Sequence, residues 1–102
     1  MPLEEYTGDT SVLSSHVIIV YDFFAHWCGP CKKLAPLFVE LSKEFPQFLF
    51  LKVEEGNEIP KFGDIRAYPT LMITKNCKVE YKSEGFDNTT IQELREKLKT
   101  FE

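Results

Sequence analysis

The sequence has 102 residues, of which 43% are hydrophobic and 27% are charged, and its formal net charge at pH 7 is −4. This length and composition are typical of one globular domain spanning residues 1–102, and they exclude a disordered or collagen-like protein. The acidic balance and the lack of any run of ~20 apolar residues argue against nucleic-acid binding, a polybasic membrane-surface module and a membrane-spanning helix.

The first half of the chain predicts a β-α-β unit. Residues 17–24 are apolar on both faces and rich in β-branched and aromatic residues, which is typical of a central strand covered by helices. Pro30 favours a helix start, and Pro36 predicts a kink within that helix. Strands joined by a helix usually pair in parallel. We expect a short strand at 3–6, a helical turn at 10–15, a strand at 17–24, a helix from 30 to 45 and a strand at 48–53.

The second half predicts a β-hairpin followed by a last helix. Asn76-Cys77 forms the tight turn between two strands that pair in antiparallel fashion. Thr90 and Glu93 have the spacing of a capping box at the start of the last helix. We expect a short helix at 58–62, strands at 70–74 and 78–83, and a final helix with an apolar face of Ile91, Leu94, Leu98 and Phe101. The fold class is therefore α/β, with one mixed sheet of four to five strands and helices on both faces.

The N-terminus and the cysteine count together indicate a reducing compartment. The first five residues are acidic rather than basic, unlike a signal peptide, and three cysteines are too few for a secreted disulfide scaffold. We therefore expect a cytoplasmic location. There, a closely spaced pair of cysteines is more often catalytic or metal-binding than structural.

Cys28 and Cys31 lie where the 17–24 strand gives way to a helix. Residues three apart are neighbours at a helix start, so the two sulfurs can close a small disulfide ring. The unpaired N–H groups and the dipole of the helix favour the thiolate of Cys28, whereas Cys31 is one turn further in and more covered. This asymmetry predicts one attacking and one resolving sulfur. Two alternatives stay open, namely inert buried thiols, or a zinc site with further ligands from Cys77, His16 and His26.

The segment Trp27-Cys28-Gly29-Pro30-Cys31-Lys32 resembles the active-site hexapeptide of the thioredoxin family throughout. Three other segments extend the resemblance: residues 21–25 are similar to the family's central strand, Ala35-Pro36 to its kinked helix and Tyr68-Pro69-Thr70 to its cis-proline turn. The resemblance as a whole covers about residues 10–101. The resemblance implies the thioredoxin fold. It also implies a general protein disulfide reductase, a redox-active centre in cellular electron transport, with Cys28 as nucleophile and Cys31 as resolving thiol.

The resemblance also implies which partners and cofactors to expect. No metal or bound cofactor is needed, and a thioredoxin reductase re-reduces the disulfide with electrons from NADPH or, alternatively, from ferredoxin. The other partners are disulfide-containing client proteins, and the chain is expected to be a monomer. Two other functions stay open: a domain like protein disulfide isomerase or an oxidase, and a scaffold subunit without redox turnover. The Gly29-Pro30 dipeptide favours a reductant over the first, and the intact pair of cysteines argues against the second.

Asp22 stands in an otherwise apolar strand, six residues before Cys28. A buried, unpaired carboxylate is costly, so the pKa of Asp22 should be raised. Such a group suits a general acid/base that removes the proton of Cys31, which is the role the family assigns to its buried aspartate. Lys52 matches a position often occupied by a lysine near that aspartate. The alternative is an aspartate at a solvated strand end.

The resemblance implies a client-binding groove around the cysteine pair. The peptide bond before Pro69 is expected to be cis, and the backbone of Tyr68 is expected to pair with an extended client strand. The tyrosine replaces the aliphatic residue common there, so its ring adds contact area, narrows the groove or simply faces solvent. The expected groove residues are Trp27, Gly29, Pro30, Tyr68, Pro69 and Gly85.

Gly85 is expected to permit close backbone approach beside the groove. Phe86 either lines the rim or packs in the core. His26 either favours the thiolate when it is charged or is an exposed bystander.

Two segments depart from the family pattern. Cys77 occupies a turn position where glycine is usual because φ is positive, and a non-glycine residue there costs about 1 kcal/mol. A distorted or longer turn is the alternative. The thiol is either an exposed regulatory group, open to glutathionylation or an intermolecular disulfide, or a tolerated change at a loop tip. Residues 54–65 are shorter than usual, which predicts a trimmed helix.

Overall fold

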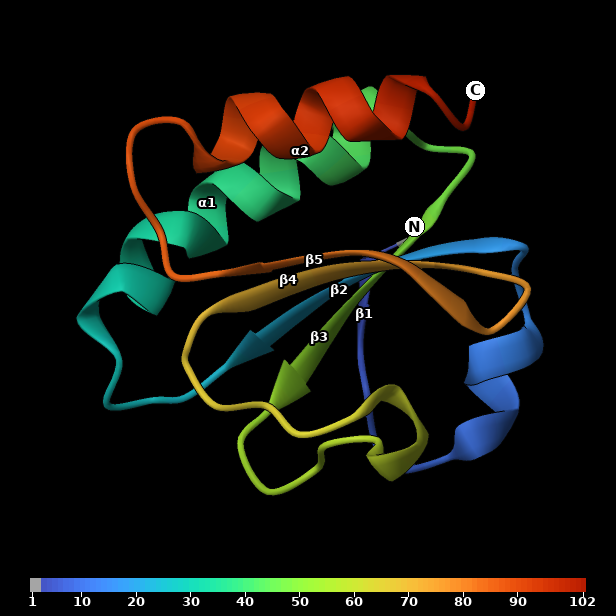
Figure 1. Cartoon of the computed structure of the whole chain (residues 1–102), viewed down its shortest axis with the longest axis horizontal. Coiled ribbons are helices and arrows are strands. Elements are labelled where there is room, and N and C mark those ends of the chain that lie inside the picture. The colour runs from blue at the N-terminus through green and yellow to red at the C-terminus, as the bar shows by residue number, and fades with distance from the viewer. Residues whose placement is uncertain (1–2) are drawn as a thin grey trace.

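A computed structural model describes residues 3–102 of the chain (Figure 1). The strands are β1 (Leu3–Glu5), β2 (Ile18–Phe24), β3 (Leu49–Glu54), β4 (Thr70–Lys75) and β5 (Lys78–Glu84). The helices are α1 (Gly29–Glu44) and α2 (Thr90–Lys99), with two short 3-10 helices, η1 (Thr10–Ser14) and η2 (Pro60–Phe62).

The five strands form one mixed sheet in the order β1-β3-β2-β4-β5. β1, β3 and β2 run parallel, whereas β4 is antiparallel to both β2 and β5. The predicted β-α-β unit and the predicted hairpin are therefore confirmed. Because β4 is antiparallel, its first residues lie at the same edge of the sheet as the last residues of β2 and β3.

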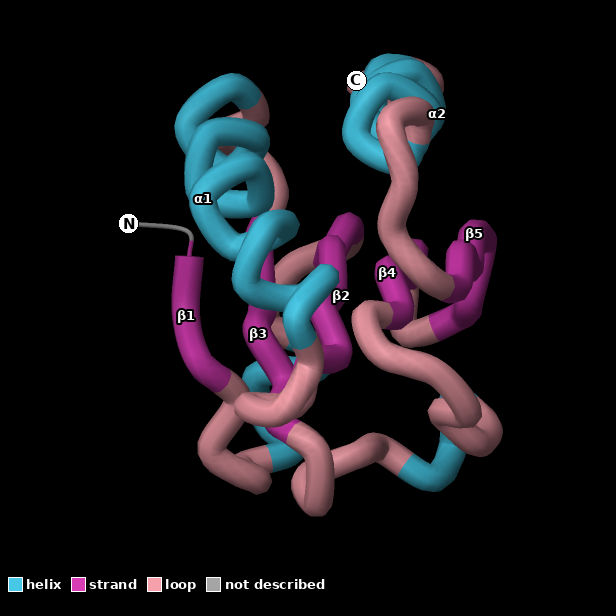
Figure 2. The backbone as a smooth tube through the Cα atoms, turned by 90° about the vertical axis from the view of Figure 1, so that its left-hand side faces the viewer, coloured by secondary structure: helices cyan, strands magenta, loops and turns pink. Residues whose placement is uncertain are grey.

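The two faces of the sheet are covered unequally. Both α-helices pack on one face, while the 3-10 helices and their loops lie on the other (Figures 1 and 2). The prediction of helical cover on both faces is confirmed, but the second face carries only short helices. In the 54–65 segment the trimmed helix is reduced to Pro60–Phe62. It ends at Gly63, whose φ of 90° does not continue a helix.

The core has one apolar layer on each side of the central strands. On the α-helical side Phe38 packs edge-on against Phe50, with ring centroids 5.3 Å apart. On the other side Tyr21 packs edge-on against Phe62 at 5.4 Å. The residues of β2 contribute to both layers, as the two-sided apolar pattern predicts, and this places every β2 side chain up to Phe23 in the interior.

The helix boundaries differ in detail from the expectations. α1 begins at Gly29 rather than Pro30, and Pro36 lies inside it, as expected. The expected capping box of Thr90 and Glu93 is wrong, because Thr90 lies inside α2 and its hydroxyl accepts a hydrogen bond from the N–H of Asp87 (2.9 Å). The Asp87 carboxylate in turn accepts a hydrogen bond from the N–H of Thr89 (2.8 Å). The start of α2 is therefore stabilised by Asp87 rather than by a capping box of Thr90 and Glu93.

Candidate redox site

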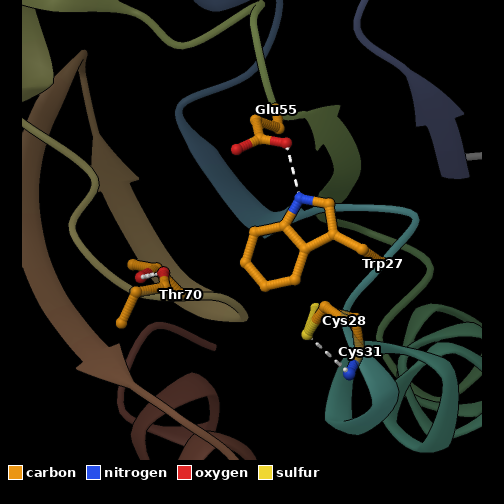
Figure 3. The surroundings of a disulfide bond; sticks show 6 residues. Trp27, Cys28, Cys31, Glu55 and Thr70 are labelled. Atoms are coloured by element: carbon orange, nitrogen blue, oxygen red, sulfur yellow. Dashed lines mark hydrogen bonds between the residues drawn. A yellow bond between two sulfur atoms is a disulfide. The ribbon is translucent and has the colours of Figure 1, made fainter.

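Cys28 and Cys31 form a disulfide at the start of α1, with their Cα atoms 5.3 Å apart. Cys28 is the N-cap residue, and its sulfur accepts a hydrogen bond from the backbone N–H of Cys31 at 3.1 Å (Figure 3). Pro30 occupies the first turn, where its missing N–H has no cost. The helix N-terminus thus directs an N–H group at the sulfur of Cys28, as the sequence position predicts.

The burial of the two cysteines does not match the expectation. Cys28 is 3% exposed and Cys31 5%, so Cys31 is not the more covered residue. The difference between them lies in their positions on the helix: Cys28 caps it and receives the N–H, whereas Cys31 lies within the first turn. Gly29, between them, has open space where a Cβ would be.

Asp22 is buried beneath this site, with 1% of its surface exposed. Neither of its carboxylate oxygens has a hydrogen-bond partner among the residues that the structure describes. Burial raises the pKa of Asp22 from 3.8 to about 7, and the positive charge of Lys52 opposes that shift. The raised pKa and the nearby lysine are both as predicted, and the alternative of a solvated strand end is wrong.

A cavity of about 210 Å³ is lined by both Asp22 and Cys31. Lys52, the register partner of Asp22 on β3, lies beside it with its Nζ 4.7 Å from the centre of the Phe24 ring. Asp22 and Cys31 therefore face a common space. The residues lining the cavity include Asp22, Phe24, Cys31, Ala35 and Lys52.

His26 lies at the rim of the same cavity and is an exposed side chain. Its Nε2 is 2.9 Å from a carboxylate oxygen of Glu54 at the end of β3. The exposed position of His26 is as one of its two alternatives had it, whereas its carboxylate partner was not predicted from the sequence.

The Tyr68–Pro69 peptide bond is cis, as predicted from the resemblance. The carbonyl of Pro69 accepts a hydrogen bond from the N–H of Gly85 at 2.8 Å. A Cβ added at Gly85 would meet no atom of residues 3–102 within 4 Å, so the space beside the groove is open, and the φ of +83° favours glycine. Phe86, one residue further on, packs against the core on the α-helical side, as one of its two alternatives had it.

Trp27 and Tyr68 meet edge to face beside the cysteine pair, with ring centroids 5.8 Å apart. Trp27 is 69% exposed, and its indole N–H donates to the carboxylate of Glu55 at 2.8 Å (Figure 3). The hydroxyl of Tyr68 donates to the carboxylate of Glu58. The ring of Tyr68 is therefore half-buried and anchored, and the alternative of a ring that simply faces solvent is wrong.

Sequence reasoning missed the roles of Glu55 and Glu58. The acidic composition of residues 54–58 was visible, but the pairing of each carboxylate with one aromatic residue depends on how the loop folds back toward the 68–70 turn. Each contact spans ten or more residues of sequence. No local pattern indicates it.

Cys77 lies at the hairpin turn as a free thiol. Asn76 and Cys77 have φ values of 51° and 66°, so the turn has two residues and is neither longer nor distorted in the way that the alternative proposed. The thiol is half-buried rather than fully exposed, because its sulfur lies 3.1 Å from the carbonyl oxygen of Leu13, to which it donates. Across residues 3–102 no group of three or more His, Cys, Asp or Glu side chains could hold a metal, so the zinc alternative lacks a ligand set.

Comparisons with known proteins agree with this geometry. The family model for thioredoxin matches residues 2–100. Thioredoxin 1 of Plasmodium falciparum is 35% identical over 85% of this chain and 86% of the relative. Thioredoxin-1 of Saccharomyces cerevisiae is 35% identical over 81% of this chain and 82% of the relative. The crystal structure of reduced Schistosoma mansoni thioredoxin superposes with a TM-score of 0.84, at 34% identity and 98% coverage of both chains.

A five-stranded mixed sheet with a redox-active Cys-Gly-Pro-Cys pair at the start of a helix defines a thiol–disulfide oxidoreductase of the thioredoxin fold. The chain belongs to the thioredoxin family, and its activity is the reduction of disulfides by dithiol exchange. Proteins of this family need no bound cofactor, because the cysteine pair itself carries the two electrons. Within the described part of the chain, no helix is both long and apolar enough to cross a membrane.

Proposed function

We propose that Cys28 is the attacking nucleophile of this reductase and that Cys31 is the resolving thiol. In the reduced protein the Cys28 thiolate attacks one sulfur of a client disulfide, and the other client sulfur leaves as a thiolate. The Cys31 thiolate then attacks Cys28 in the mixed disulfide and releases the second client sulfur. Two electrons pass to the client, and the Cys28–Cys31 disulfide remains. The observation that carries this assignment is the hydrogen bond from the Cys31 N–H to the Cys28 sulfur at the helix N-terminus.

Asp22 acts as the general acid/base for Cys31. With a pKa of about 7, its carboxylate is present in a large fraction near neutral pH and can accept the Cys31 proton before the resolving step. The shared cavity of about 210 Å³ has room for water, so the proton can pass through one water molecule. Asp22 then returns this proton to a departing client thiolate, and solvent supplies the second.

The client binds as an extended segment across the groove beside the cysteine pair. Within residues 3–102 no backbone–backbone hydrogen bond uses the peptide groups of Tyr68, which leaves them available to a client strand. The cis-proline turn and Gly85 form one side of this groove, linked by the hydrogen bond between Gly85 and Pro69. The proposed client-binding residues are Trp27, Gly29, Pro30, Tyr68, Pro69 and Gly85.

The protein works as a single-domain monomer, residues 1–102, in the cytoplasm. A thioredoxin reductase that draws on NADPH re-reduces its disulfide, and its substrates are disulfide-containing client proteins. The Gly29-Pro30 dipeptide supports the reducing direction, since the resemblance associates it with reductants. The free thiol of Cys77 is compatible with a reducing compartment.

A mixed-disulfide trap tests the assignment of the two cysteines. Both variants are made in a Cys77→Ser background, so that the free thiol cannot form adducts. Cys31→Ser should accumulate covalent adducts with client proteins that dithiothreitol releases, whereas Cys28→Ser should accumulate none. Equal trapping by the two variants, or trapping by Cys28→Ser alone, would contradict the assignment. A coupled assay with NADPH and a thioredoxin reductase then tests the electron donor.

A further inference from the structure

Trp27 and Tyr68 form an aromatic corner on one side of the client groove. The two rings are nearly perpendicular, with an interplanar angle of 86°. Tyr68 also packs against the small cluster that contains Cys28 and Cys31, so the corner borders the reacting sulfurs directly. Trp27 extends from the loop before the disulfide, close to the cysteine pair (Figure 3). A side chain next to the attacked cysteine of a bound client would lie within reach of this corner.

The position of each ring is held by a carboxylate from one short loop, residues 55–58. Glu55 accepts the indole N–H of Trp27 at 2.8 Å. Glu58 accepts the hydroxyl of Tyr68 and, at 3.0 and 3.2 Å, the backbone N–H of Gly56. The Glu58 carboxylate accepts hydrogen bonds from both Tyr68 and the backbone of its own loop, so the loop fixes the position of the carboxylate and, through it, that of the Tyr68 ring.

The Glu58 carboxylate keeps its negative charge beside the site. Partial burial acts to raise the pKa of Glu58, but the hydrogen bonds from Tyr68 and Gly56 outweigh it and lower the pKa below its usual value. Neither Glu55 nor Glu58 has a cationic partner within residues 3–102, where the ion pairs found are His26–Glu54 and Arg95–Glu44. A separate groove of about 510 Å³, which Tyr68 borders together with residues of the 55–65 segment, is lined by Glu55 and Glu58 and is therefore negatively charged.

The aromatic corner and its carboxylates match the chemistry of a cationic side chain. An ammonium or guanidinium group is attracted to the face of an aromatic ring, and a guanidinium can also stack on it. The same group gains from two unneutralised carboxylates at the edge of the corner, whereas an acidic side chain would be repelled. The whole chain adds to this preference, since its net charge is −4.

We infer that Tyr68 and Glu58, together with Trp27 and Glu55, are specificity-determining residues that make this reductase prefer client disulfides flanked by arginine or lysine. The inference rests on the proposed function, because it requires that the client lie along Tyr68 while Cys28 attacks. The hydroxyl of Tyr68 links the aromatic corner to the Glu58 carboxylate.

Three disulfide peptides that differ only in one residue beside the cysteine, arginine, glutamine or glutamate, test this inference. The rate constant for the pre-reduced protein is measured at low salt in single turnover. We expect the arginine peptide to react about tenfold faster than the glutamine peptide, and the glutamate peptide to react slowest. High salt should compress these differences. Equal rates for the three peptides would overturn the inference.

Two variants assign the preference to the proposed residues. Glu58→Gln keeps an acceptor for the Tyr68 hydroxyl but removes the charge, and Tyr68→Phe keeps the ring but removes the hydroxyl. Each should reduce the arginine preference by about threefold or more. Glu80→Gln, an exposed change near the hairpin end of β5, removes the same charge far from the groove and should leave the preference intact. An unchanged preference in Glu58→Gln, or an equal loss in Glu80→Gln, would refute the inference.

A small uncharged disulfide separates this inference from the proposed function. Reduction of 2-hydroxyethyl disulfide needs the cysteine pair but no client side chain in the aromatic corner. It should proceed in the wild type, and at a similar rate in the distant control Glu80→Gln. If the wild type fails to reduce it, the proposed chemistry is wrong; if it is reduced while the peptides react equally, only the specificity inference is wrong.

Discussion

Substitution of the buried aspartate, Asp22→Asn, should remove a large pH dependence of stability. Burial raises the folded-state pKa of Asp22 to about 7 from an ordinary value of 3.8. The folded protein thus binds this proton more tightly than the unfolded chain does. The stabilisation is fully present below pH 3.8 and is lost as the pH rises through about 7.

The size of the effect follows from these two pKa values. At ~1.4 kcal/mol per pH unit, the difference between 3.8 and about 7 corresponds to a loss of about 4 kcal/mol of unfolding free energy by pH 8. The carboxylate is 1% exposed and has no hydrogen-bond partner among the described residues, so solvent screens this cost little. An asparagine amide also leaves polar atoms buried, but that cost does not vary with pH.

Urea unfolding of the oxidised protein at several pH values between 4 and 8, followed by far-UV circular dichroism, measures the effect. The unfolding free energy of Asp22→Asn minus that of the wild type should rise by about 4 kcal/mol over this range. Asp87→Asn is the control: hydrogen bonds from Thr89 lower the pKa of Asp87, so its contribution is lost as the pH falls instead. A pH-independent difference for Asp22→Asn would show that this carboxyl does not titrate near neutrality, and the reasoning would fail.

Four further substitutions test other parts of the structure. Lys52→Met removes the charge that opposes the shift, so the pKa of Asp22 should rise above about 7, measurable by ¹³C NMR of the carboxyl; a fall would contradict the assigned interaction. Gly85→Ala should lower the unfolding free energy in urea by about 1–2 kcal/mol, because Gly85 has a positive φ. Gly29→Ala should be neutral or stabilising by up to about 1 kcal/mol. Equal effects of the two substitutions would show that the positive φ of Gly85 has no cost for alanine. Cys77→Gly should stabilise the hairpin by about 0.5–1 kcal/mol in thermal unfolding, and a loss would mean that the contact to Leu13 outweighs the turn strain.

The elements that carry their own local signal could be predicted from the sequence. The two-sided apolar run of β2 indicated a central strand, and a single aspartate within it was therefore expected to be buried. Asn76-Cys77 lies between two strand patterns of suitable length, so the hairpin was visible although its second residue is not glycine. In each case, residues adjacent in sequence determine the structure.

The parts that were missed or wrong depend on competition between neighbours or on contacts distant in sequence. Thr90 and Glu93 have the capping-box spacing. However, Asp87 lies three residues before Thr90, and its N–H donates a hydrogen bond to the Thr90 hydroxyl instead. The anchoring of Tyr68 by Glu58 depends on the path of the trimmed 54–65 segment, which no periodicity describes. The equal burial of the two cysteines likewise reflects the surrounding loops rather than their spacing.

The topology of the sheet explains why these separate features meet at one place. The last residues of β2 and β3 and the first residue of β4 share an edge, because Phe24 pairs with Glu54 and Phe23 pairs with Thr70. The disulfide follows β2, the acidic loop follows β3 and the cis-proline turn precedes β4, so all three converge there. The buried carboxyl of Asp22 lies behind the disulfide, whereas the charged aromatic corner lies beside it. The proposed proton transfer and the proposed client selection therefore use different residues on the two sides of one cysteine pair, so substitution of one set should leave the other function intact.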